Sequence, residues 1–185
     1  MAECLLFLAE GFEEVEALTP VDLLRRAGIG VKTVSVTKDH MVTGSHGIGV
    51  RADKVFDDLD QQTIEKTDML IFPGGMPGTE NLRAFEPLME LLDYFVESGK
   101  YVSAICAAPT LLGQRGHLKG KKACCYPGLE EKLEGAEVFT NACISDGNII
   151  TSRGAGCAVE FSLEIIRRLH SWDEAERISS SIVHK

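Results

Sequence analysis

The sequence predicts an α/β fold in which helices cover both faces of a mainly parallel sheet. Short apolar runs alternate with longer amphipathic segments along the whole chain, which is the pattern of successive βα units. Two of these runs, residues 4–9 and 68–73, are continuously apolar, as strands buried on both faces require. We find no internal repeat, linker or low-complexity tract and expect residues 1–185 to form one domain.

The first half of the chain predicts three core strands, at residues 4–9, 31–37 and 68–73. Between the first two, residues 13–27 predict a helix that ends at Gly28. Pro20 lies inside this helix, so we expect a kink or a split there. The segment HMVTGSHGIGV, residues 40–50, has glycine turns between short β-prone runs and predicts a small hairpin.

The second half predicts a strand at 101–105, a strand at 121–126 and helices at about 79–98, 108–115, 128–134, 157–169 and 172–183. Pro87 interrupts the first of these helices. The segment EVFTNACISDGNIITS predicts a hairpin with Asp146 and Gly147 at its turn. Ser171 and Glu174 have the spacing of a capping box for the last helix.

Composition argues against several classes of function. The net charge of −9 and a pI near 5.1, without a Lys/Arg-rich run, disfavour binding to nucleic acid. The apolar runs are of strand length, so we expect no membrane span. The N-terminal segment has no basic region before its apolar run and is a first strand rather than a signal peptide. We therefore expect a cytoplasmic protein.

The six cysteines and five histidines show no metal-site spacing. There is no Cys-x-x-Cys pair, no cysteine has a histidine at zinc-finger spacing, and the glycine-containing segments GIGVRA and GAGCAV lack the third glycine of a dinucleotide fingerprint. The sequence therefore predicts neither a metal nor another cofactor. In a reducing compartment the cysteines are expected to be free thiols.

One cysteine stands where a strand turns directly into a helix. In the segment YVSAICAAPT, Cys106 follows a buried strand, and Ala104, Ala107 and Ala108 are the small neighbours that a nucleophile elbow needs. A helix N-terminus favours a thiolate there. The pattern alone leaves a buried structural thiol as an equal alternative. Ligands bind such sheets beyond the carboxyl ends of the strands, so the loops AEGFEEVE, PGGMPGTEN and CAAPT are the candidate site.

Four segments together resemble the ThiJ/PfpI superfamily, a group of class I glutamine amidotransferase-like domains, and within it the deglycase branch. They are LAEGFEEVEALTPVDLLRRAGI, LIFPGGMPGTENL, AICAAPTLL and IITSRGAGCAVEFSLEII, in the family's order and over nearly the whole chain. The resemblance implies a flavodoxin-like three-layer sandwich, a homodimer and no cofactor.

The resemblance also implies roles for individual residues. Cys106 matches the reactive elbow cysteine, and Glu16 matches a protonated glutamate that hydrogen-bonds its sulfur. Gly75 matches a backbone N–H that faces the cysteine, and with the Ala107 N–H it is expected to form an oxyanion hole. Gly74 is expected beside them as a binding residue.

Three further positions are compared with the residues that are usual there in the deglycase branch. Arg26 is retained as a binding residue, whereas His46 stands where the branch commonly has arginine, and Tyr126 stands where it often has histidine. A related protease-like branch places histidine directly after the cysteine. Ala107 occupies that position here, so peptidase activity is disfavoured.

Two functions follow as hypotheses. The first is an enzyme in which Cys106 attacks methylglyoxal, another small carbonyl compound, or its adducts on amines and thiols, in the manner of a deglycase or glyoxalase. The second is a non-enzymatic redox sensor or stress chaperone that acts through oxidation of the same cysteine. No residue requires the nucleoside- or thiamine-related role that old family labels suggest.

Overall fold

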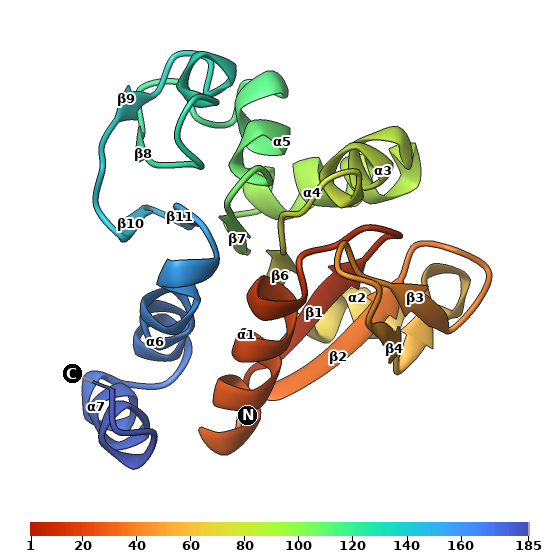
Figure 1. The fold of residues 1–185 in the computed structure, drawn as a ribbon, viewed down its shortest axis with the longest axis horizontal. Coiled ribbons are helices and arrows are strands. Elements are labelled where there is room, and N and C mark those ends of the chain that lie inside the picture. The colour runs from red at the N-terminus through yellow and green to blue at the C-terminus, as the bar shows by residue number, and fades with distance from the viewer. Residues whose placement is uncertain (185) are drawn as a thin grey trace.

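A computed structural model of the chain describes residues 1–184. Its strands are β1 (Glu3–Leu8), β2 (Gly30–Ser35), β3 (Met41–Thr43), β4 (Gly49–Arg51), β5 (Lys54–Val55), β6 (Met69–Phe72), β7 (Tyr101–Ile105), β8 (Lys122–Ala123), β9 (Glu137–Val138), β10 (Cys143–Asp146) and β11 (Ile149–Ser152). Seven of them form one sheet in the order β10-β11-β7-β6-β1-β2-β5 (Figure 1). Neighbouring strands are parallel except β10 and β11.

Helices cover both faces of this sheet. The core on one face includes α1 (Glu14–Arg26), α6 (Ala158–Leu169) and α7 (Trp172–Ser181), and the core on the other includes α3 (Gly78–Ala84), α4 (Glu86–Glu97) and α5 (Pro109–Gln114). Strand β1 sends Leu6 and Leu8 into the first core, and Leu5 and Phe7 into the second. All four are buried, because successive side chains of a strand point to opposite faces. The flavodoxin-like three-layer class is therefore confirmed.

The N-terminal half leaves the helix at Pro20 in one piece and adds two short elements that were not predicted. Helix α1 runs unbroken through Pro20, so the helix is not split. Strand β5 adds a parallel edge to β2, although it has only two residues and no periodicity to reveal it. Helix α2 (Gln61–Lys66) was not predicted either; it is six residues long and begins at Asp60, whose carboxylate accepts the Thr63 N–H at 2.7 Å.

The C-terminal half contains the predicted hairpin, but its turn lies at a different position. Strands β10 and β11 pair antiparallel with Asp146 opposite Ile149, so Gly147 and Asn148 form the turn one residue later than predicted. Residues 137–138 pair instead with β8 in a separate two-stranded sheet. Within the predicted strand at 121–126, only Lys122–Ala123 is a strand, since the Cys124 N–H donates to the Thr151 side chain at 3.0 Å. At the predicted acidic helix, Glu130–Lys132 form a single 3₁₀ turn.

The architecture places the three candidate loops together. Strands β1, β6 and β7 are parallel neighbours, so their carboxyl ends lie at one edge of the sheet. The predicted hairpin β3–β4 lies beside the start of α1, and Figure 1 shows α1 between this hairpin and the C-terminal helices α6 and α7. Among the described residues, no helix has both the length and the apolar character that crossing a membrane requires.

Candidate active site

Cys106 occupies the predicted elbow between β7 and α5 in a strained backbone conformation. Its φ is +66°, in the left-handed region that side chains other than glycine rarely adopt. Hydrogen bonds on both sides hold this residue: its N–H donates to the Ser152 carbonyl at 3.0 Å, and its own carbonyl accepts the Tyr126 N–H at 2.8 Å. Strain of this kind costs on the order of 1–3 kcal/mol and persists only where the surroundings fix it. The thiol is half-buried and so still reachable from solvent.

Glu16 lies beside this thiol, as the resemblance implied. It is in the first turn of α1, is only 1% exposed, and its side chain is hydrogen-bonded to that of Cys106. The Gly74 N–H donates to Glu16 Oε2 at 2.9 Å. A Cβ at Gly74 would lie 2.7 Å from both the Cys106 Cβ and Glu16 Oε2, so only glycine fits between the two side chains.

Two backbone N–H groups complete the surroundings of the sulfur. Those of Gly75 and Ala107 both hydrogen-bond to Cys106 and act to lower the pKa of its thiol. Gly75 has a φ of +92°, and a Cβ there would lie 2.3 Å from the Glu13 nitrogen. The loop after β6 therefore brings an N–H to the sulfur by using two glycines that have no space for side chains.

The pKa values of the two side chains depend on each other. Burial raises the pKa of Glu16 to about 7. Burial, followed by the charge of an ionised Glu16, raises the pKa of Cys106 to about 12. With the proton on Glu16, that repulsion disappears and the carboxyl donates to the sulfur, so the two groups share one proton and titrate as a pair.

The helix contributes less to this thiol than the sequence suggested. We expected the N-terminus of a helix to lower the pKa of Cys106. Helix α5 begins only at Pro109 and has six residues, so the local N–H groups of Gly75 and Ala107 are what oppose the raised pKa. A thiolate at this position therefore depends on where the shared proton resides.

A cavity of about 360 Å³ opens in front of the thiol. Cys106, Gly75, Ala107 and Tyr126, all predicted site residues, line it. No role was predicted for the other lining residues, which are Met76, Glu80, Thr110, Pro127, Leu129 and Lys132. The first three lie in two of the loops singled out by the βα pattern, whereas the last three come from the segment after Tyr126, where no pattern indicated a site.

The structure does not bring Arg26 to this cavity. Its Nε donates to Asp22 at 2.9 Å in the last turn of α1, and its side chain is 51% exposed. It lies twelve residues along the helix from Glu14, a rise of about 18 Å. Within one chain, therefore, Arg26 and Cys106 lie apart, and Arg26 does not line this cavity.

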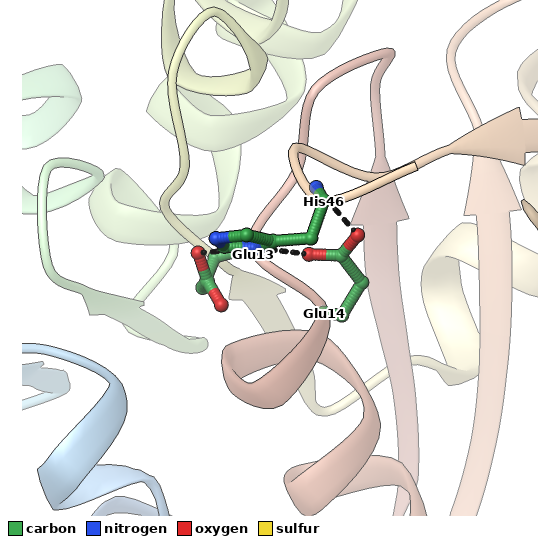
Figure 2. A group of neighbouring side chains, drawn as sticks. All are labelled: Glu13, Glu14 and His46. Carbon is green, nitrogen blue, oxygen red and sulfur yellow. Dashed lines mark hydrogen bonds and ion pairs between the residues drawn. The ribbon is translucent and has the colours of Figure 1, made fainter. Parts of the chain in front are cut away.

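His46 also lies outside the cavity, at the turn between β3 and β4. Its backbone N–H donates to Glu14 Oε1 at 2.8 Å, and its Nδ1 is 2.9 Å from Glu14 Oε2 (Figure 2). Burial of Glu14 acts to raise its pKa, but hydrogen bonds from His46 and Ile48 outweigh this effect and lower the pKa to about 2. An ionised Glu14 thus joins the hairpin to α1, which the sequence did not indicate.

The remaining cysteines lack the elbow conformation of Cys106. Burial raises the pKa of four of them, namely Cys4, Cys124, Cys125 and Cys143. All six cysteines are free. Cys157, at the start of α6, is half-buried like Cys106 but follows a 3₁₀ turn rather than a strand. Of the six, only Cys106 has a positive φ.

The fold and the elbow together define a class: flavodoxin-like α/β proteins with a cysteine at the strand-to-helix turn and a buried carboxyl beside it. Comparison with known families agrees with this class. The chain belongs to the DJ-1/PfpI family, whose model matches residues 2–168.

Individual relatives support the same assignment. The chain is 36% identical over 178 residues to Protein DJ-1 homolog B of Arabidopsis thaliana, covering 95% of this chain but only 40% of that longer protein. It is 33% identical over 168 residues to Deglycase PfpI of Pyrococcus furiosus, covering 89% of this chain and 98% of that one. The solved structure of oxidized Toxoplasma gondii DJ-1 superposes with a TM-score of 0.92 at 33% identity, covering 100% and 99% of the two chains.

Proposed function

We propose that this protein is a cofactor-independent enzyme that converts small reactive carbonyl compounds, or their adducts on amines and thiols, through Cys106. The observation that carries the proposal is the pairing of an elbow thiol with the buried carboxyl of Glu16 and two N–H groups. A relative named as a deglycase supports the same reaction class.

For methylglyoxal the steps balance without an external oxidant. The Cys106 thiolate adds to the aldehyde carbon, a C–S bond forms, and the carbonyl π electrons become an oxyanion. Glu16 protonates this oxygen, giving a hemithioacetal. Its carboxylate then carries the proton of the first carbon to the second carbon through an enediol, while the hydroxyl proton passes from the first oxygen to the second. The first carbon is thereby oxidised to a thioester and the ketone is reduced to an alcohol. Water hydrolyses the thioester, which releases lactate and the free thiol.

The N–H groups of Gly75 and Ala107 stabilise two negative charges, one after the other. They hydrogen-bond to the sulfur in the resting site. Once the sulfur has bonded to the aldehyde carbon and lost its charge, they are available to the oxyanion on that carbon until Glu16 protonates it. Donors placed in this way typically contribute about 2.7–4 kcal/mol to such steps.

The cavity supports substrates that are larger than methylglyoxal itself. Apolar groups of Met76, Pro127 and Leu129 line it, while Glu80 and Lys132 supply opposite charges. An adduct carried on an amine or thiol would place its carbonyl-derived carbon at Cys106 and its carrier chain along these walls. Tyr126, 53% exposed, can offer a hydroxyl hydrogen bond there but is a poor proton acceptor at neutral pH.

The test is lactate release from methylglyoxal. We expect Cys106→Ser to reduce it to background and Glu16→Gln to reduce it by about 10²–10⁴-fold, the usual contribution of a general acid–base group. Cys157→Ser is the matched control, since that thiol is also half-buried. Equal rates in wild type, Cys106→Ser and Glu16→Gln would refute the mechanism.

The alternative function, a redox sensor or stress chaperone, relies on the same sulfur. It is favoured by the solvent access of Cys106 and by the likeness to a DJ-1 solved in an oxidized form. If mild peroxide adds oxygen mainly to Cys106, as seen by peptide mass spectrometry, and the wild type releases no lactate, sensing is the better description. Uniform oxidation of all six cysteines would count against it.

We propose further that the protein is a homodimer. Exposed apolar side chains gather on the outer face of α1 and on the adjoining hairpin: Val15, Leu18, Met41 and Ile48 are 38–54% exposed. Sedimentation should give a mass of twice 20.2 kDa, and Leu18→Asp should shift it toward a single chain. Val183→Asp, at an exposed position after α7, should leave the mass unchanged. A single-chain mass for the wild type would exclude the dimer.

A further inference from the structure

Four side-chain atoms converge on one point where the hairpin β3–β4 meets the start of α1. They are His46 Nδ1, Glu13 Oε2, Glu14 Oε2 and Ser45 Oγ. Figure 2 shows the imidazole of His46 and the carboxylates of Glu13 and Glu14 turned toward one another. The nitrogen and the carboxylate oxygens of this group lie within 4.8 Å of one another.

The separations match the edges of a tetrahedral metal centre. Nδ1 of His46 lies 2.9 Å from Glu14 Oε2 and 3.6 Å from Glu13 Oε2. Ser45 Oγ lies 3.1 Å from that nitrogen and 3.2 and 3.3 Å from the oxygens of Glu13 and Glu14. Metal–ligand bonds of about 2.0–2.1 Å in a tetrahedron place the ligand atoms about 3.3 Å apart. Five of the six edges are therefore within a few tenths of an ångström of this value.

Backbone hydrogen bonds also orient one of the proposed ligands, the Glu14 carboxylate. The Glu14 side chain is only 6% exposed, and its other oxygen, Oε1, accepts the N–H groups of His46 and Ile48. These bonds fix the carboxylate so that Oε2 faces the cluster, as outer hydrogen bonds do for metal ligands. His46 is 67% exposed in the single chain, so its ring is not enclosed by residues of its own chain.

Charge favours a divalent cation at this point. The N-terminus of α1 contributes roughly half a positive charge, which two carboxylates outweigh. A cation would replace the hydrogen bond between His46 Nδ1 and Glu14 Oε2. One imidazole nitrogen with carboxylate oxygens suits zinc and its neighbours rather than calcium or magnesium, which prefer oxygen alone.

We propose that Glu13, Glu14 and His46 form a binding site for a divalent transition metal, Zn²⁺ above all, with Ser45 or a water held by it at the fourth position. The site is separate from Cys106 but joined to it through one loop, because the Glu13 N–H donates to the Gly74 carbonyl at 3.0 Å.

The test is Zn²⁺ binding to the intact protein, measured by competition with a chromophoric chelator in a Cys106→Ser background. We expect one Zn²⁺ per chain, and an affinity at least about tenfold lower in His46→Gln and in Glu13→Gln. His170→Gln is the matched control, since that histidine is exposed and lies after α6, away from the cluster.

A spectrum identifies the ligands independently. Bound Co²⁺ should show the intense visible bands of a tetrahedral centre without thiolate-to-cobalt charge transfer, and these bands should be lost in His46→Gln. Far-UV circular dichroism confirms that each variant is folded. The proposal is overturned if the wild type binds no Zn²⁺, if His46→Gln and Glu13→Gln bind as tightly as the wild type, or if the Co²⁺ spectrum shows thiolate ligands.

Discussion

Replacing Gly75 by alanine is expected to destabilise the fold by about 3–5 kcal/mol, whereas the same change at Gly99 should cost about 1–2 kcal/mol. Both glycines have a positive φ, +92° and +77°, so both variants incur the left-handed backbone cost. At Gly75 the new Cβ would also lie 2.3 Å from the Glu13 nitrogen and 2.6 Å from the Gly11 oxygen, whereas nothing lies within 4 Å at Gly99. Backbone atoms cannot rotate away from the new Cβ. Steric overlap therefore contributes more of the destabilisation at Gly75 than the left-handed φ does.

Urea denaturation of the two variants measures the difference between their free energies of unfolding. The comparison isolates the cost of steric overlap at Gly75, because the cost of a positive φ is common to both variants. If Gly75→Ala and Gly99→Ala lose the same stability, then the loop after β6 can move away from α1 without cost. The N–H group of residue 75 would then not be held rigidly against Cys106, and the proposed oxyanion site would lose its preorganisation.

The central strands and the turn at Cys106 could be predicted from the sequence because both follow from local rules. Continuous apolar runs at β1 and β6 identify buried parallel strands, and a cysteine followed by small residues identifies a tight turn. The positive φ of Cys106 agrees with that expectation. Short elements such as β5 and α2 escaped prediction since they have two and six residues, too few to show a period.

The parts of the site that could not be predicted depend on contacts between distant segments. Lys132 reaches the cavity from a 3₁₀ turn whose sequence reads as an ordinary acidic surface segment. Glu14 joins His46 across 32 residues, and nothing in either segment indicates its partner. The raised pKa of Cys106 likewise results from burial and from Glu16, neither of which the residues around the thiol reveal.

Replacing Glu16 by glutamine is expected to stabilise the protein by about 3 kcal/mol at pH 8 and to leave its stability unchanged below about pH 4.5. The ordinary pKa of the carboxyl is 4.5, and burial raises it to about 7 in the folded chain. Between these values the folded state holds a proton that the unfolded state has lost, so stability falls as pH rises through this window. Above it the folded protein carries the full cost of a buried charge, which glutamine avoids.

Thermal and urea unfolding from pH 4.5 to pH 8 test this dependence, with Glu97→Gln, an exposed acid in α4, as the control that should not change its slope. The expectation does not depend on which member of the pair is ionised, because linkage counts protons and not their location. A wild type and a Glu16→Gln variant with parallel pH profiles would show that the folded pair takes up no proton beyond the one that the thiol also holds in the unfolded chain. In that event burial would not raise the proton affinity of the pair between pH 4.5 and pH 7, so the stability measurement tests the coupling between Glu16 and Cys106 on which the proposed chemistry rests.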